Sequence, residues 1–399
     1  MNELIPKIKQ LSEAYFEEVR AYRHHLHSNP ELSFEEYETA SFIEQKLHEI
    51  GITDTERIAE TGITFCLGQQ NKGKIIALRA DIDALPIEEK NDVSYRSKKS
   101  GVMHACGHDV HTASLLGAAK ILHELRDDWS ESGAIKFIFQ PAEEKSPGGA
   151  SILIKEGILE NPKPERILGQ HVMPLIQTGK VGFRKGKYMA SADEIYLTVK
   201  GKGGHAAMPE NFVDPIAIAS QIIVSLQQVV SRFANPKIPS VLSFGKIAGG
   251  KVNNVIPDEV KIDGTFRTFN EAWRKEALKR IKEMAMGIAE SMGASCDVTI
   301  ADGYPFLANN EAYTANNIHA AKAYLGEENV EELDLWMAAE DFAFYSHHVD
   351  ACFYRLGTRN ESTGKTSGVH TPTFDIDEDA LKTGMGLMAY LTINELTQS

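Results

Sequence analysis

Residues 103–111 read MHACGHDVH and form a dense set of side chains able to bind a divalent metal ion. Cys106 and His108 are two residues apart, so they cannot face the same way on a helix, but they can in a turn or at the end of a strand. A helical pattern of leucine and alanine begins only at Leu115. We therefore expect the pair in a loop that leads into a helix. Taken alone, the pair is equally consistent with a free buried cysteine beside an unrelated histidine.

Further polar side chains follow a series of short apolar runs, and these runs predict strands. The runs alternate with helical patterns at 111–127 and 148–158, which indicates an α/β layer with a central, mostly parallel sheet flanked by helices. The runs cover residues 63–67, 75–78, 135–139, 167–168 and 352–356.

Each polar group comes after the carboxyl end of a predicted strand, where ligands gather in open α/β sheets. A single carboxylate in such a place is usually a helix cap. Several groups that join the loop of Cys106 and His108 favour a metal site instead. The groups are Asp81 and Asp83, Glu143 and Glu144, His171, and His370.

The mixed donor set suits zinc, although manganese, cobalt or nickel also fit. Five ligands are too many for one catalytic zinc, but they suit two ions ~3.5 to 4 Å apart that share one ligand. The Cys106 thiolate could be that shared ligand. Glu143 and Glu144 are neighbours, and on an extended segment they point to opposite sides. One can then hold metal while the other serves as general base. The simpler interpretation of the second glutamate is a solvated carboxylate at a helix start.

Residues 186–305 differ from the rest, because their pattern predicts strand, helix, two strands, helix and strand. This βαββαβ order is the ferredoxin-like arrangement. It indicates a complete domain inserted into a discontinuous catalytic domain made of residues 1–185 and 306–399.

The net charge and the hydrophobicity of the chain disfavour some classes of partner. The 399-residue chain carries a net charge of -14, which disfavours nucleic acid and acidic membrane surfaces as partners. No apolar run approaches the ~20 residues of a membrane helix, and the N-terminus lacks a signal-peptide pattern, so we expect a cytoplasmic protein.

The loop 201–206 (GKGGHA) is no nucleotide site, since no helix opens after it. His24, His25 and His27 read as helix-terminal or solvated side chains.

Seven stretches closely resemble the metal-dependent amidohydrolases of the aminoacylase and carboxypeptidase G clan, and they match in order over essentially the whole chain. The resemblance is strongest to the branch of hippurate hydrolase, the indoleacetyl-amino-acid hydrolases and N-acetyl-diaminopimelate deacetylase. The stretches are 77–86 (ALRADIDALP), 103–108 (MHACGH), 139–144 (FQPAEE), 203–207 (GGHAA), 254–258 (NVIPD), 339–342 (AEDF) and 370–372 (HTP).

The resemblance implies a role for each matching residue. Cys106 would bridge two metal ions, Glu144 and His370 would hold one, and His108 and His171 the other. Glu143 would be the base that passes a proton to the leaving amine. Most of the clan has a metal-binding histidine where this chain has Asp81, whose role stays open; Asp83 looks like the carboxylate that orients a ligand imidazole.

The inserted domain resembles the family's lid and dimerisation domain. Within it, the resemblance implies that His205 donates to the tetrahedral oxyanion, Asn254 contacts substrate and Arg267 clamps the substrate carboxylate. A loop histidine, a turn asparagine and a surface arginine are the commoner fates of these residue types.

The resemblance therefore implies hydrolysis of a small N-acyl-L-amino acid by a homodimer formed through the lid domain, and it leaves open whether His205 acts within its own subunit or across the dimer. A dipeptidase or aminopeptidase of the same clan is one alternative, and a non-catalytic regulatory protein with a metal site is another.

Overall fold

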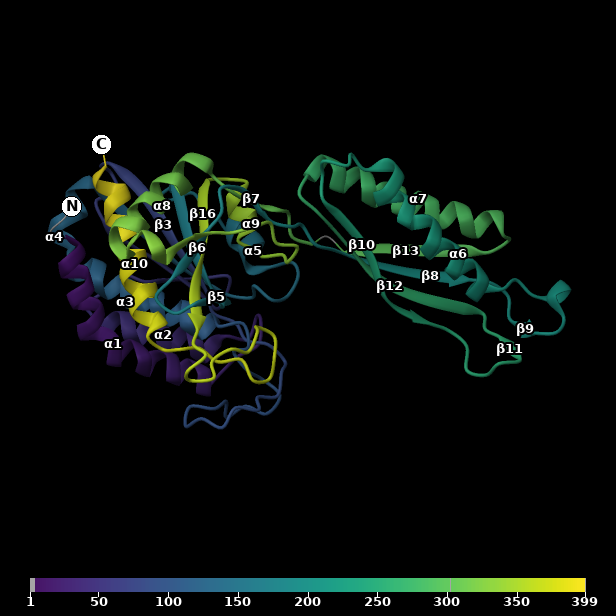
Figure 1. The fold of residues 1–399 in the computed structure, drawn as a ribbon, viewed down its shortest axis with the longest axis horizontal. Coiled ribbons are helices and arrows are strands. Elements are labelled where there is room, and N and C mark those ends of the chain that lie inside the picture. The colour runs from purple at the N-terminus through teal and green to yellow at the C-terminus, as the bar shows by residue number, and fades with distance from the viewer. Residues whose placement is uncertain (1–3, 302, 399) are drawn as a thin grey trace. The chain divides into compact units, whose positions relative to one another are not determined.

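The runs predicted as strands lie in an eight-stranded sheet with the order β1-β2-β4-β3-β5-β16-β6-β15. The computed structural model describes residues 4–301 and 303–398 (Figure 1). Neighbours β4, β3, β5 and β16 run parallel, while β1, β2 and β6 pair antiparallel. The strands are β1 (Glu56–Ile58), β2 (Gly62–Gly68), β3 (Lys74–Asp81), β4 (Gly133–Gln140), β5 (Arg166–Gln177), β6 (Val181–Phe183), β15 (Val330–Glu332) and β16 (Asp350–Arg359).

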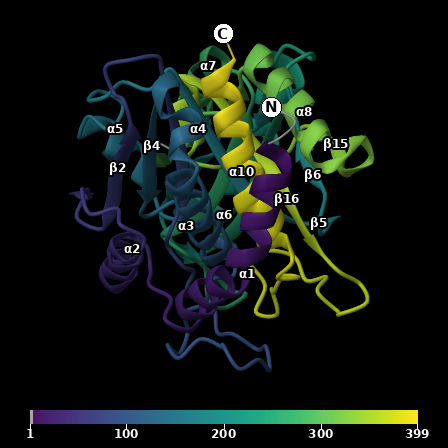
Figure 2. The same cartoon turned by 90° about the vertical axis from the view of Figure 1, so that its left-hand side faces the viewer.

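Helices cover this sheet. Figure 2 shows α1, α3 and α10 together on one face, although they come from the two ends and the middle of the chain. Their buried side chains join those of the central strands in one hydrophobic core. The helices of this unit are α1 (Leu4–Ser28), α2 (Tyr37–Glu49), α3 (His108–Glu124), α4 (Arg126–Trp129), α5 (Gly149–Lys155), α8 (Glu311–Leu325) and α10 (Ala380–Thr397), with 3-10 turns at Ser130–Ser132 and Glu327–Asn329.

The second unit is the predicted βαββαβ fold. Its four strands form an antiparallel sheet in the order β10-β12-β8-β13, the ferredoxin-like order, and α6 and α7 pack on it over a core of its own (Figure 1). The elements are β8 (Asp193–Lys200), β9 (Gly204–His205), α6 (Pro215–Gln228), β10 (Ser240–Ala248), β11 (Val255–Ile256), β12 (Glu259–Thr268), α7 (Glu271–Ser291) and β13 (Ser295–Ala301), with short turns at Pro209–Asn211 and Val229–Phe233.

The unit boundaries lie close to the predicted ones in sequence. One unit takes residues 4–186, 308–334 and 344–398, and the other takes Lys187–Leu307 and Leu335–Ala343. The chain passes between them at β7 (Gly186–Met189), at β14 (Leu307–Asn309), between Asp334 and Leu335, and at the start of α9 (Ala343–Ser346). The short segment Leu335–Ala343 had no strand or helix pattern to set it apart from the catalytic part.

By length and composition, one helical segment of the described chain, Pro215–Phe233, could cross a membrane, contrary to the expectation that no run approaches that length. Such a segment alone is weak evidence, because core helices have the same composition. Ile218, Ile222 and Leu226 pack into the core of the second unit, whereas Ile216, Val224 and Phe233 are exposed.

Candidate metal centre

Strand register brings distant polar residues to one edge of the sheet. Asp81 at the end of β3 pairs with Gln140 at the end of β4. On the other side, Arg79 of β3 pairs with Gly169 of β5, so His171 lies level with Asp81. The carboxyl ends of parallel strands meet at this edge, which is where the sequence placed the site.

The loop that carries Cys106 and His108 reaches the same edge and opens α3, which begins at His108. Gly107 between them has a φ of 84°. A Cβ atom at Gly107 would lie 2.6 Å from Cγ2 of Val172, so only glycine fits there. The main-chain N–H of His370 donates to the carbonyl of Ala105 at 2.7 Å, so the segment that carries His370 is held against this loop.

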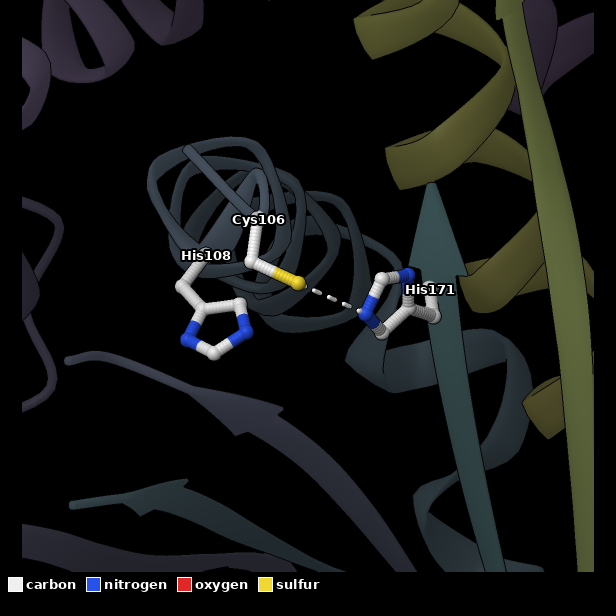
Figure 3. Close-up of side chains that lie close together, drawn as sticks. All are labelled: Cys106, His108 and His171. Carbon is white, nitrogen blue, oxygen red and sulfur yellow. Dashed lines mark hydrogen bonds between the residues drawn. The ribbon is translucent and has the colours of Figure 1, made fainter. Parts of the chain in front are cut away.

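Cys106 lies between His108 and His171, with its sulfur directed toward His171 (Figure 3). Its sulfur is 3.4 Å from Nε2 of His171 and 3.3 Å from Nε2 of His370. His370 Nε2 is also 3.1 Å from a carboxylate oxygen of Glu144. The sulfur therefore occupies the position between the two predicted ligand pairs that a bridging thiolate requires.

His108 has one ring nitrogen in use and one open. Its Nδ1 contacts Asp83 at 3.0 Å, which is the orienting contact predicted for Asp83. Its Nε2 is buried without a hydrogen-bond partner among the described residues, 3.8 Å from Asp81 and 3.9 Å from Glu144. Burial alone would lower the pKa of His108, but Asp81 and Asp83 outweigh it and raise the pKa to about 10.

Asp81, whose role the sequence left open, acts on another histidine. It contacts Nδ1 of His111 at 2.5 Å, and Nε2 of His111 accepts the N–H of Val172 at 2.9 Å. The carbonyl of Val172 in turn holds Nδ1 of His171 at 2.8 Å. His171 is thereby fixed with Nε2 toward Cys106. The sequence pattern indicated no separate role for His111, although it lies one helical turn after His108, because its partner Asp81 is remote in sequence.

The turn with Glu143 and Glu144 differs from the expectation. The segment is not extended: Ala142 has a φ of 52°, and the strand ends at Gln140. Ligand atoms of Glu143, Glu144 and His108 lie within 4.8 Å of one another. The prediction that strand alternation sends the two carboxylates to opposite sides was wrong, and a left-handed residue sets their direction instead.

The donor set fits divalent cations. Ligand atoms of Cys106, His108 and His171 lie within 4.8 Å of one another, and so do those of Cys106, Glu144 and His370. Without a cation, burial raises the pKa of the Cys106 thiol, and the charges of Glu144 and Glu143 raise it further. A bound divalent ion reverses that effect by deprotonating its thiol ligand. The buried Nε2 of His108 is open for the same ion.

Three further predicted residues lie on the second unit. His205 is paired in β9 with Val255 of β11, and the carbonyl of Asn254 accepts the N–H of Ala206 at 3.1 Å, so His205 and Asn254 lie together at a small two-stranded sheet. Arg267 lies near the last residue of β12, where its guanidinium donates to the carbonyl of Met337 at 3.1 Å. This two-stranded sheet adjoins the opposite end of β12, since the N–H of Gly201 donates to the carbonyl of Asp258.

His27 lies in the last turn of α1, as predicted, but it is not solvated. It is fully buried, with Nδ1 2.8 Å from Asp109 and Nε2 3.1 Å from Glu89. Arg23 joins Asp109 at 2.8 Å and Asp375 at 2.7 Å. This ionic cluster ties the first helix to the start of α3 and to the segment after His370, so it supports the site without being part of the ligand set.

Comparison with known proteins supports the same interpretation. The sequence model of peptidase family M20/M25/M40 matches residues 77–394. N-acetyl-L-cysteine deacetylase of Bacillus subtilis (strain 168) is 43% identical over 362 residues, 90% of this chain and 83% of that protein. N-acyl-L-amino acid amidohydrolase of Geobacillus stearothermophilus is 43% identical over 298 residues, 75% of this chain and 80% of that protein.

A solved structure matches both units. The Bacillus subtilis YXEP protein, described as a dinuclear metal binding peptidase from the M20 family, has a TM-score of 0.80 at 34% identity. The match covers 96% of this chain and 99% of that chain. The matched sequence region includes every predicted metal ligand, from Cys106 to His370.

Proposed function

The chain belongs to peptidase family M20/M25/M40, and on that basis we propose that it hydrolyses the amide bond of small N-acyl-L-amino acids. The observation that carries the proposal is the position of Cys106 between His171 and His370, with Glu143 and Glu144 beside His108. A purely structural metal site has no use for the additional glutamate.

Two divalent ions are proposed at this centre, one held by His108 and His171 and one by Glu144 and His370, with Cys106 shared. When bound, they would polarise the amide carbonyl and acidify a water molecule. Zinc, manganese, cobalt and nickel are all compatible with this donor set.

Glu143 is the proposed general base. It takes a proton from the attacking water as the new carbon–oxygen bond forms, and it delivers that proton to the amide nitrogen as the carbon–nitrogen bond breaks. The products are a carboxylate and the free amino acid. His205 would stabilise the oxyanion, and Arg267 would pair with the carboxylate of the amino acid.

The separation of these lid residues supports a dimer. Arg267 and Glu259 are eight residues apart on β12, a span of roughly 26 Å at the rise of a strand, and His205 and Asn254 lie beyond the Glu259 end. A small substrate cannot contact both ends of this strand. We therefore propose that His205 and Asn254 serve the active site of a second copy.

A surface suited to that second copy is present on the same unit. Strand β10 is an edge strand, and its Val241 and Ile247 are exposed. On the same unit, α6 also exposes Ile216 and Val224. Edge strands with apolar side chains pair readily with another chain.

The activity is tested with metal-replete protein and a panel of N-acetyl and N-benzoyl amino acids, each run with and without chelator. We expect chelator-sensitive release of the free amino acid. Hydrolysis of dipeptides together with resistance of their N-acetylated forms would instead identify an aminopeptidase or dipeptidase. If no panel member is hydrolysed, the proposed activity is wrong and the alternative of a non-catalytic binding protein is favoured.

A further inference from the structure

Glu36, the residue before α2, is a fully buried carboxylate that reaches the turn of the two glutamates. Its Oε1 accepts the main-chain N–H of Ala142 at 2.8 Å, across 106 residues of sequence. Its Oε2 accepts the hydroxyl of Thr61 at 2.8 Å. Both oxygens therefore have a defined donor, and one donor is the main chain of the turn itself.

The turn is held on both sides of Glu143. Ala142 adopts a left-handed conformation that strains residues with a side chain. Its N–H is bound by Glu36, and its carbonyl accepts the N–H of Gly149 at 2.8 Å. On the other side, the N–H of Glu144 donates to Asp83 at 3.1 Å. Two buried carboxylates thus hold the amides that flank the proposed base.

Burying the carboxylate of Glu36 is unfavourable for folding, so stability alone does not explain its place. Burial raises the pKa of Glu36 to about 7, and the charge of Asp83 adds to the effect. A buried carboxylate near another carboxylate is unfavourable unless its hydrogen bonds are worth more than the repulsion. The hydrogen bond from Ala142 is one of the two that offset this cost, and it holds a turn in which Ala142 has a positive φ.

We propose that Glu36 is a positioning residue for amide hydrolysis: by accepting the N–H of Ala142 it sets the turn that presents Glu143 and Glu144 beside His108. This inference rests on the proposed function. Glu36 itself is not among the ligands, and it acts only through the main chain of Ala142.

The test compares Glu36→Ala and Glu36→Gln in the full chain. For Glu36→Ala we expect kcat to fall by ~10 to 100-fold with little change in KM, since an indirect role alters the reacting geometry but not substrate contacts. Metal affinity, measured by competition with a chromophoric chelator, should fall by ~10-fold because Glu144 sits on the same turn. Glu36→Gln keeps an acceptor oxygen and should stay within a few-fold of the wild type.

Two further variants separate positioning from general destabilisation. Glu31 is a matched control, because it is also a buried carboxylate that accepts a main-chain N–H, that of Thr39 at 2.8 Å, and it does not touch the turn. Glu31→Ala should lower thermal stability without lowering kcat. Ala142→Gly added to Glu36→Ala should recover several-fold in kcat, since glycine adopts a positive φ without steric cost.

The proposal is overturned if Glu36→Ala keeps the wild-type kcat and metal affinity, if Glu31→Ala lowers kcat equally, or if Ala142→Gly gives no recovery. Should Glu36→Ala not fold, Glu36→Asp, which is one methylene too short to reach Ala142, takes its place with the same expected loss. If the wild type hydrolyses no N-acyl amino acid, the proposed function fails, and the chelator competition still decides the role of Glu36.

Discussion

Nε2 of His171 lies 3.4 Å from the sulfur of Cys106, although the two residues come from different elements, β5 and the loop before α3. The contact is directional, because Nδ1 of His171 is held by the carbonyl of Val172 and Nε2 is left to face the sulfur. A metal ligand with its second nitrogen fixed in this way is oriented before the ion binds.

Glu143→Gln should retain the bound metal ions and lose turnover by ~100 to 10,000-fold, because the variant keeps the shape of the side chain but cannot accept a proton. Metal content is measured by elemental analysis and turnover by release of the amino acid. Glu144→Gln is the matched variant, and it should lose both turnover and bound metal. Loss of metal from the Glu143 variant alone would reverse the two assignments.

His205→Ala should lower kcat by ~100 to 1000-fold, the usual effect of removing an oxyanion donor. Because we propose that His205 serves a second copy, mixing His205→Ala with Glu143→Ala after subunit exchange should restore about a quarter of wild-type activity, since half of the mixed dimers are heterodimers with one intact site. Activity that stays at the level of the separate variants would show that His205 acts within its own subunit.

Asp83→Ala should weaken metal binding by ~10 to 100-fold, because Asp83 holds Nδ1 of His108 at 3.0 Å and also the N–H of Glu144. Asp83→Asn keeps an oxygen in place and should have a smaller effect. Chelator competition measures both. Equal and negligible effects of the two variants would mean that His108 is oriented by its helix alone.

The high pKa of Glu36 predicts a pH dependence of stability. Its pKa is about 7 in the folded protein against an ordinary value of 4.5, so the stabilisation is full below about 4.5 and is lost as the pH rises through about 7. Between pH 4 and pH 8, the unfolding free energy of the wild type should therefore fall by roughly 3 kcal/mol relative to that of Glu36→Gln. Urea denaturation measures it, and a constant difference would contradict the assignment.

The sequence predicted the strands and helices well where a local pattern is strong. β8 and β12 (Asp193–Lys200 and Glu259–Thr268) are the first and third strands of the predicted βαββαβ order. The convergence of Cys106, Glu144, His171 and His370 was also predictable, because strand ends of a parallel sheet share an edge.

Other features left no local signal. The N–H of Ala142, whose φ is positive, donates to Glu36, which is 106 residues away in the chain. The link from Asp81 through His111 to Val172 likewise joins separate elements. Such long-range hydrogen bonds carry no periodicity, so sequence reasoning assigned Asp81 no role and read the glutamate turn as extended.

Stepwise addition of metal to metal-free protein, with release of an amino acid from its N-acetyl derivative followed at each step, tests the central claim most directly. We predict no release without metal and full activity at about two ions per subunit. Activity in the metal-free protein, or saturation with metal without any release of amino acid across the substrate panel, would contradict a two-ion amidohydrolase centred on Cys106.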